Sequence, residues 1–182
     1  MVYRLNGKRV AILVANGFEQ IELTEPRRIL DEAGAKTEIV SPETNRVKGW
    51  KSKVWGDEFL VDVSLDEAQA SHYDALLLPG GVMNPDSLRL ENKALEFIRD
   101  FSKQDKPIAA ICHGPWLLIN AELAKGVKLT SWPSIKQDLI NAGAKWVDQE
   151  AVIDGKILTS RKPDDIPAFS EAMVKLFSQK EI

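Results

Sequence analysis

Short apolar runs of strand length recur along the chain and alternate with stretches of helical spacing. Residues 9–15 are mostly apolar and end at the turn Asn16-Gly17, and residues 74–79 and 107–111 repeat this pattern. Strands that are buried on both faces are typical of parallel sheets whose connections are helices. We therefore predict a mostly parallel α/β sheet with helices on both faces.

Two further segments refine this prediction. Residues 47–63 are rich in Val, Trp and Phe around Gly49 and Gly56, which indicates a small antiparallel β-hairpin excursion. The run Thr24-Glu25-Pro26 is typical of a helix start, because a hydroxyl can cap the helix and proline suits its first turn. We expect the first helix to begin there.

Length and charge exclude several classes of protein. The 182 residues suit a single domain over residues 1–182, and the net charge of −3 offers no basic surface for nucleic acid. The apolar run from Val10 to Ala15 is too short for a signal peptide or a membrane span. We expect a cytoplasmic protein without a membrane or nucleic-acid partner.

The single cysteine, Cys112, directly follows the strand predicted over residues 107–111 and precedes a helix that starts near Pro115. The positive end of a helix favours thiolate, and His113 offers a base beside the thiol. A lone cysteine is more often a small buried hydrophobe. The run His113-Gly114-Pro115 nevertheless favours a sharp turn that carries a nucleophile.

Other polar groups follow neighbouring strands at the same edge of the sheet. Glu19 can exchange a proton with the thiol or the substrate, although it can also be an acid that merely leads a helix. Gly80 and Gly81 offer backbone N–H groups that, with that of His113, can hold an oxyanion. His72 has no metal-ligand spacing to Cys112 or His113, so we expect no metal site and no cofactor.

Four segments together resemble the PfpI-type intracellular protease and deglycase family, and the similarity to bacterial general stress proteins is closest. The segments span nearly the whole chain, at residues 16–26, 78–81, 106–115 and 160–165. The resemblance implies a glutaminase-related, flavodoxin-like three-layer fold.

The resemblance also implies roles for individual residues. Cys112 would be the nucleophile, His113 its neighbouring imidazole and Glu19 the carboxyl that hydrogen-bonds the thiol. Asp86 would come from a second subunit to orient the histidine, at a position where protease-like members carry glutamate. A homo-oligomer is therefore expected, either a dimer or a hexamer.

Three functions remain open at this point. The first is a glyoxalase or deglycase that acts on small reactive carbonyls or glycated proteins, with Cys112 as nucleophile and Glu19 as proton carrier. The second is an intracellular cysteine peptidase, in which His113 and Asp86 activate the thiol. The third is a redox sensor or chaperone whose thiol is oxidised without turnover. The shorter acid at position 86 favours the first function.

Overall fold

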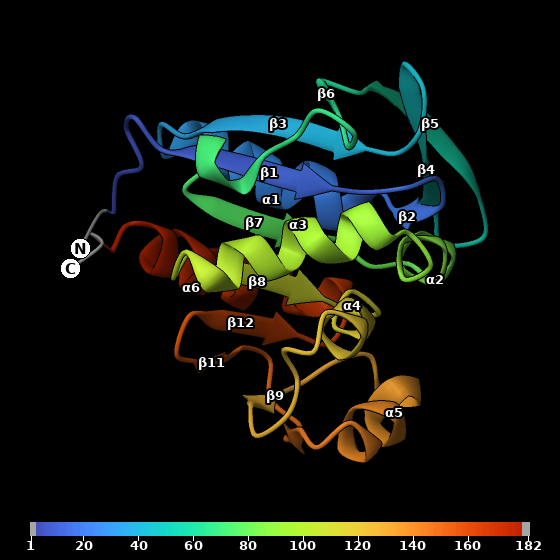
Figure 1. Cartoon of the computed structure of the whole chain (residues 1–182), viewed down its shortest axis with the longest axis vertical. Helices are drawn as coiled ribbons and strands as arrows, with labels where there is room; N and C mark the ends of the chain where they lie inside the picture. Colours follow the sequence, from blue (N-terminus) through green and yellow to red (C-terminus); the bar gives the residue numbers. More distant parts are fainter. Residues whose placement is uncertain (1–2, 180–182) are drawn as a thin grey trace.

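The computed structural model describes residues 3–179, and a seven-stranded sheet lies at its centre (Figure 1). All neighbouring strands in this sheet are parallel except the edge pair formed by its last two strands in the sequence. The strands, in spatial order, are β11 (Val152–Asp154), β12 (Ile157–Ser160), β8 (Ile108–Ile111), β7 (Ala75–Leu78), β1 (Arg9–Leu13), β3 (Lys36–Ser41) and β6 (Val63–Ser64). The predicted mostly parallel, flavodoxin-like sheet is confirmed.

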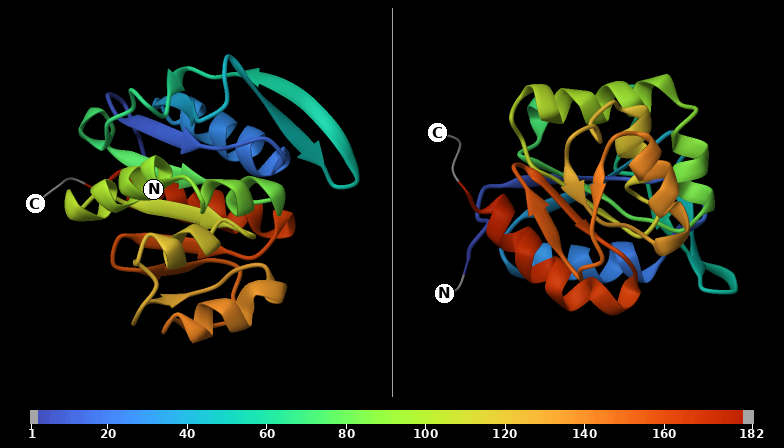
Figure 2. Two further views of the ribbon diagram at one scale, coloured as in Figure 1. Left: turned by 45° about the vertical axis from the view of Figure 1, so that its right-hand side comes forward. Right: turned by 90° about the horizontal axis from the view of Figure 1, so that it is seen from below.

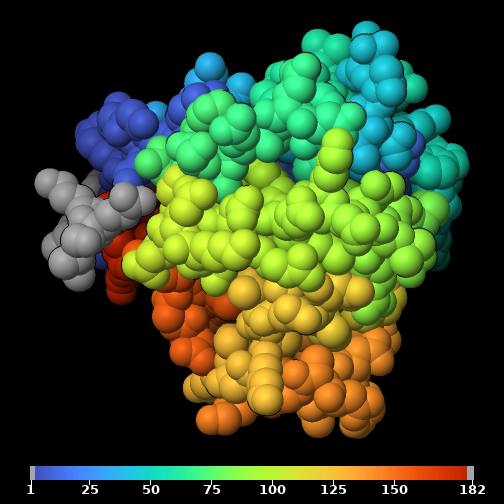
Figure 3. Space-filling model, viewed as in Figure 1, coloured from blue at the N-terminus to red at the C-terminus, as the bar shows by residue number. Residues whose placement is uncertain are grey.

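Helices cover both faces of this sheet, as the two views of Figure 2 show. One face carries α1 (Ile21–Glu32) and α6 (Ile166–Phe177). The other carries α2 (Met83–Leu88), α3 (Asn92–Lys103), α4 (Trp116–Asn120) and α5 (Lys136–Asn141). In the space-filling view, residues 83–103 form a yellow-green band across this second face (Figure 3). No helix within residues 3–179 is long and apolar enough to cross a membrane.

Alternation along the strands builds the two apolar layers. On β1, Val10 and Ile12 are buried toward α1 and α6, whereas Ala11 and Leu13 are buried toward the opposite helices. Successive side chains of a strand point to opposite faces, so an all-apolar strand fills both layers at once. The apolar runs of the sequence thus account for the three-layer arrangement.

Two smaller sheets flank the central one. β2 (Phe18–Glu19) pairs in parallel with β4 (Arg46–Lys51), and β4 forms an antiparallel hairpin with β5 (Val54–Leu60). This hairpin, coloured cyan to teal, projects from the main body in Figure 2 and confirms the predicted excursion. β9 (Lys128–Leu129) and β10 (Lys145–Trp146) form the second small sheet. Three 3-10 helices, η1 (Ala70–His72), η2 (Pro133–Ile135) and η3 (Pro163–Asp165), complete the described elements.

The first helix begins earlier than its sequence predicts. α1 starts at Ile21 and contains Pro26, and the N–H of Thr24 donates to the Gln20 carbonyl at 2.9 Å. Proline removes one hydrogen bond within a helix, but burial of apolar side chains such as Leu23 holds the helix together across it. The earlier start places Glu22 in the first turn, on a buried face of the helix.

Candidate active site

Cys112 leaves β8 in a left-handed backbone conformation, with φ of 64°. This conformation costs a non-glycine residue about 1–2 kcal/mol, so the surroundings must hold it in place. The N–H of Cys112 donates to the Ser160 carbonyl at 3.1 Å, and its carbonyl accepts from the N–H of Trp132 at 2.8 Å. The strained turn directs the thiol to the wall of a cavity instead of continuing the strand.

Glycines let the backbone approach this turn closely. A Cβ on Gly114 would lie 2.6 Å from the Leu78 carbonyl oxygen, and a Cβ on Gly80 would lie 2.6 Å from that of Ile111. No real side chain tolerates such contacts with rigid backbone, so only glycine fits at both positions. The elbow that the sequence predicts at Cys112 is therefore packed against the end of β7.

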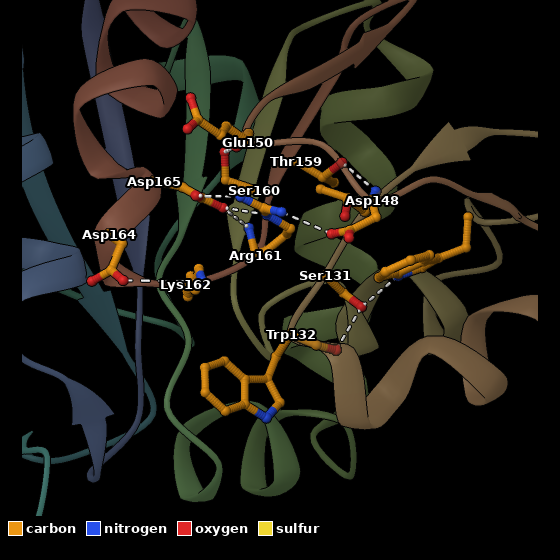
Figure 4. Close-up of polar contacts among 12 residues, drawn as sticks. Ser131, Trp132, Asp148, Glu150, Thr159, Ser160, Arg161, Lys162, Asp164 and Asp165 are labelled. Atoms are coloured by element: carbon orange, nitrogen blue, oxygen red, sulfur yellow. Dashed lines mark hydrogen bonds and ion pairs between the residues drawn. The ribbon is translucent and has the colours of Figure 1, made fainter.

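A network after β12 supports the same turn from the other side (Figure 4). The backbone N–H and the Nε of Arg161 each donate to Asp165 Oδ2 at 2.9 Å, and Nη2 donates to Oδ1 at 2.9 Å. Nη1 donates to Asp148 Oδ1 at 2.8 Å. Because Asp165 is buried, this charged, two-point contact anchors the chain directly after Ser160, whose carbonyl holds Cys112.

The carboxyl beside the thiol belongs to Glu22. Its side chain is fully buried, its Oε1 accepts from the Gly80 N–H at 3.0 Å, and Cys112 and Glu22 each shift the pKa of the other. Burial, and secondarily the nearby Glu19 carboxyl, raise the pKa of Glu22 to about 8. Glu22 is therefore mostly protonated at neutral pH.

This arrangement corrects the position expected for Glu19. Glu19 lines the same cavity, but its Oε1 accepts from the Ser52 N–H at 3.1 Å, on the β4–β5 hairpin. Two acids three residues apart can each reach the edge of the sheet, and the helix start decides which one faces inward. Because α1 begins at Ile21, the inward position falls to Glu22.

The state of the thiol also differs from the sequence expectation. Burial, followed by the Glu22 carboxyl, raises the pKa of Cys112 above its ordinary value, so the resting group is a thiol and not a thiolate. The helix that follows, α4, has only five residues and cannot offset this burial. Attack by Cys112 therefore requires a base to remove its proton.

His113 is placed to be that base. Its Nδ1 lies 3.3 Å from Cys112 Sγ, and burial lowers the pKa of the imidazole, which is thus neutral at pH 7. Two indoles hold the ring: Trp132 is stacked on it with centroids 5.9 Å apart, and Trp116 meets it edge-on at 5.1 Å. A neutral, fixed imidazole beside the thiol can accept its proton.

Backbone donors at the thiol come from Gly81 and His113, whose N–H groups lower the pKa of Cys112 against the effect of burial. These are two of the three donors that the sequence predicts. The third, the Gly80 N–H, is occupied by Glu22, so the expectation that it holds an oxyanion is corrected. Gly80 instead positions the carboxyl.

Asp86 lies on the exposed side of α2, and no hydrogen bond or ion pair joins it to His113 within residues 3–179. Its proposed contact with a histidine of another subunit therefore stays a prediction. The buried member of this helix is Asn84, whose Oδ1 accepts from the Ala15 N–H at 2.7 Å and whose Nδ2 donates to the Pro79 carbonyl at 3.0 Å. Asn84 thus ties the end of β1 to the glycine turn that follows β7.

The thiol opens into a cavity of about 470 Å³. Chain segments from six parts of the sequence line it. They are Gly17, Glu19, Glu22, Trp50, Ser52, Gly81, Val82, Met83, Cys112, His113, Trp132 and Pro163. A thiol, a neutral imidazole, a protonated carboxyl and two backbone donors thus meet at one end of an accessible cavity, which suits addition of sulfur to a carbonyl carbon.

Comparison with known proteins identifies the family. Residues 8–176 match the model of the DJ-1/PfpI family. General stress protein 18 of Bacillus subtilis is 41% identical over 174 residues, covering 95% of this chain and 99% of that protein. Protein/nucleic acid deglycase 2 of Escherichia coli is 43% identical over 170 residues, covering 93% and 97%. The crystal structure of Drosophila melanogaster DJ-1beta superposes with a TM-score of 0.85 at 30% identity, covering 95% of this chain and 91% of that one. The chain belongs to the DJ-1/PfpI family, as its motifs indicate.

Proposed function

We propose that this protein is a cysteine-dependent enzyme that converts reactive 2-oxoaldehydes such as methylglyoxal into 2-hydroxy acids, acting on the free aldehyde or on the aldehyde as it is released from its adduct with a protein amine or thiol. The observation that carries the proposal is the position of the Cys112 thiol between the neutral imidazole of His113 and the protonated carboxyl of Glu22. The names of two relatives support it, since one from Escherichia coli and one from Pyrococcus horikoshii are called deglycases.

The first step forms a carbon–sulfur bond. His113 accepts the thiol proton as Cys112 Sγ attacks the aldehyde carbon, and the carbonyl π electrons move to oxygen. The N–H groups of Gly81 and His113 are the donors available to stabilise this oxyanion, which takes its proton from the Glu22 carboxyl to give a hemithioacetal and leaves Glu22 as a carboxylate that can act as the base of the next step. Attack by a neutral thiol is thereby coupled to proton transfer, as its raised pKa requires.

The second step moves hydrogen between the two carbonyl carbons. A base removes the proton from the former aldehyde carbon, and a proton is returned to the neighbouring ketone carbon. The first carbon is oxidised to a thioester and the second is reduced to an alcohol, so no external oxidant is needed. Water then hydrolyses the thioester, giving the 2-hydroxy acid and free Cys112. We assign this proton transfer to Glu22, because a carboxyl with a pKa of about 8 is suited to give and take protons near neutral pH.

The test is consumption of methylglyoxal by the purified protein, beside cleavage of a fluorescent casein substrate. We expect Cys112→Ala and Glu22→Gln each to lower aldehyde consumption by about 10²-fold or more, on the order of a lost general acid or base. Glu19→Gln is the matched control, since it removes a carboxyl of the same cavity that bonds the hairpin, and it should lose less than about tenfold.

The same assay separates the alternatives. One Bacillus subtilis relative at 41% identity is named a putative cysteine protease. A cysteine peptidase is therefore the second candidate function, and casein cleavage is its assay. Casein cleavage that needs Cys112, without aldehyde loss, would replace our proposal by the peptidase. If a correctly folded protein neither consumes methylglyoxal nor cleaves casein, the result would favour a redox sensor whose thiol is oxidised without turnover.

Asp86 can be tested for action across a subunit contact. Cys112→Ala and Asp86→Asn proteins are each expected to be impaired alone. When they are mixed and allowed to exchange subunits, the Asp86→Asn protomer keeps its thiol and receives Asp86 from its partner, so activity should reappear. If mixing restores nothing, the prediction that Asp86 acts from a second subunit is wrong.

A further inference from the structure

The cavity beside Cys112 is much larger than the reacting group requires. Its volume of about 470 Å³ lies in the range of pockets that enclose drug-sized ligands, roughly 300–1,000 Å³. A three-carbon dicarbonyl fills only a small part of that space. The remaining volume is therefore available to a substituent carried on the carbonyl compound.

The walls around this spare volume are apolar and partly exposed. Trp50 comes from β4, Val82 and Met83 from the start of α2, and Trp132 from the loop before η2. Val82 is 54% exposed, Met83 38% and Trp132 37%. No lysine or arginine lines the cavity among the residues that the structure describes. Large apolar side chains gathered at a cavity mouth favour a neutral apolar ligand, whose binding removes them from water.

Trp132 places this apolar wall next to the chemistry. One side of its indole is stacked on His113, with 23° between the ring planes, and His113 Nδ1 lies 3.3 Å from the sulfur. In Figure 4 the indole of Trp132 points away from the polar network around Arg161. A group attached to a carbonyl carbon bonded to Cys112 would therefore lie within reach of the indole.

Trp50 is held in place on the hairpin. Its Nε1 donates to the Ser52 carbonyl at 2.9 Å, and the ring of Trp55 meets its own edge-on with centroids 5.2 Å apart. Trp55 does not line the cavity, so it supports Trp50 from outside. The cavity thus has a fixed aromatic residue on the hairpin as well as one beside the histidine.

We propose that Trp132 and Trp50 form a subsite for a flat apolar substituent, so that the preferred substrates are 2-oxoaldehydes carrying an aryl group and not methylglyoxal itself. This inference rests on the proposed function, because the reacting end of the substrate is the same. Stacking and burial of an aryl ring against an indole should strengthen binding of the aryl substrate by about tenfold.

The experiment compares kcat/KM for phenylglyoxal and methylglyoxal in the wild type, Trp132→Ala, Trp132→Phe and Leu90→Ala. The ratio of the two substrates within one protein cancels any effect on His113, since both substrates use it. We expect Trp132→Ala to lower the phenylglyoxal preference about tenfold and Trp132→Phe to restore most of it. Leu90 is 85% exposed and outside the cavity, and its variant should keep the wild-type ratio. An unchanged ratio in Trp132→Ala would overturn the subsite.

A binding measurement keeps the subsite testable if the chemistry is different. Acetophenone carries the aryl ketone without an aldehyde, and its binding to Cys112→Ala protein can be measured by isothermal titration calorimetry, which does not depend on the fluorescence of Trp132. Saturable binding that is lost in the Cys112→Ala/Trp132→Ala protein supports the subsite even if neither aldehyde is consumed, in which case only the proposed reaction fails. Absence of saturable binding to Cys112→Ala contradicts the subsite itself.

Discussion

The elbow at Cys112 and the β4–β5 hairpin border the same cavity but are built in opposite ways. The elbow is buried, and backbone groups from the ends of β7, β8 and β12 hold it. The hairpin is mostly exposed, and its contacts with the body include Gln20, whose Oε1 accepts from the Asp57 N–H at 2.8 Å. The Cys112 thiol thus sits on the rigid part of the molecule, whereas part of the cavity wall sits on a segment that can change with little effect on the core.

The largest expected effect is the dependence of stability on pH that Glu22, the buried acid beside the elbow, produces. Above its ordinary pKa of 4.5 Glu22 is ionised in the unfolded chain, but it stays protonated in the folded protein up to about pH 8. The folded state therefore holds more protons in this window, and the free energy of unfolding falls as the pH rises from about 5 to 8, by up to about 5 kcal/mol.

Glu22→Gln removes the carboxyl that titrates. The free energy of unfolding of this variant should therefore change less with pH over the same window than that of the wild type. Urea denaturation at pH 5, 6, 7 and 8 measures the difference between the two proteins. Parallel pH profiles for the wild type and Glu22→Gln would show that the carboxyl is not held protonated. Glu19→Gln serves as the control for removal of a nearby charge.

A second expected effect sharpens the contrast in packing. Gly114→Ala forces a Cβ to within 2.6 Å of the Leu78 carbonyl and should lower the free energy of unfolding by about 3 kcal/mol, as overpacking does. Gly155→Ala, at the β11–β12 turn, has no atom within 4 Å of its new Cβ. This variant should lower the free energy of unfolding by only about 1 kcal/mol, because alanine is strained at the φ of 59° that Gly155 adopts. Equal losses in the two variants would mean that the elbow is no more tightly packed than a surface turn.

The smallest expected effect is on the hairpin. Trp55→Ala removes an indole that is 48% exposed, so the free energy of unfolding should fall by less than about 1 kcal/mol. The support of Trp50 is lost, so phenylglyoxal should be used less well while methylglyoxal is little affected. A loss of stability as large as that of Gly114→Ala would remove the distinction between the two regions.

Local patterns were enough to predict the central sheet and the sharp turn that carries Cys112. Apolar runs of strand length identify β1, β7 and β8, and the glycine and proline after Cys112 identify the turn. The same patterns misplaced the start of α1, since Thr24 and Pro26 are good starting residues in isolation. Tertiary packing lets the helix begin at Ile21 instead. The acid that faces the thiol is therefore Glu22 and not Glu19.

Other parts of the site depend on contacts between distant segments. Trp132 reaches His113 from a loop after a two-residue strand, and Asn84 bonds groups at the ends of β1 and β7. No local periodicity marks either residue, because each acts through chain segments that meet only in the folded protein. The raised pKa of Cys112 has the same origin, since burial is a property of the whole assembly.

The hydrogen bond from Cys112 to Ser160 makes the thiol a reporter of folding. The cysteine adopts its native position only when β12 has paired with β8, which requires closure of the long intervening chain. Before that contact forms, the side chain is an ordinary accessible thiol, and afterwards it is only 6% exposed. Its rate of alkylation in the native protein by a reagent too large for the cavity therefore measures the free energy needed to open this edge of the sheet.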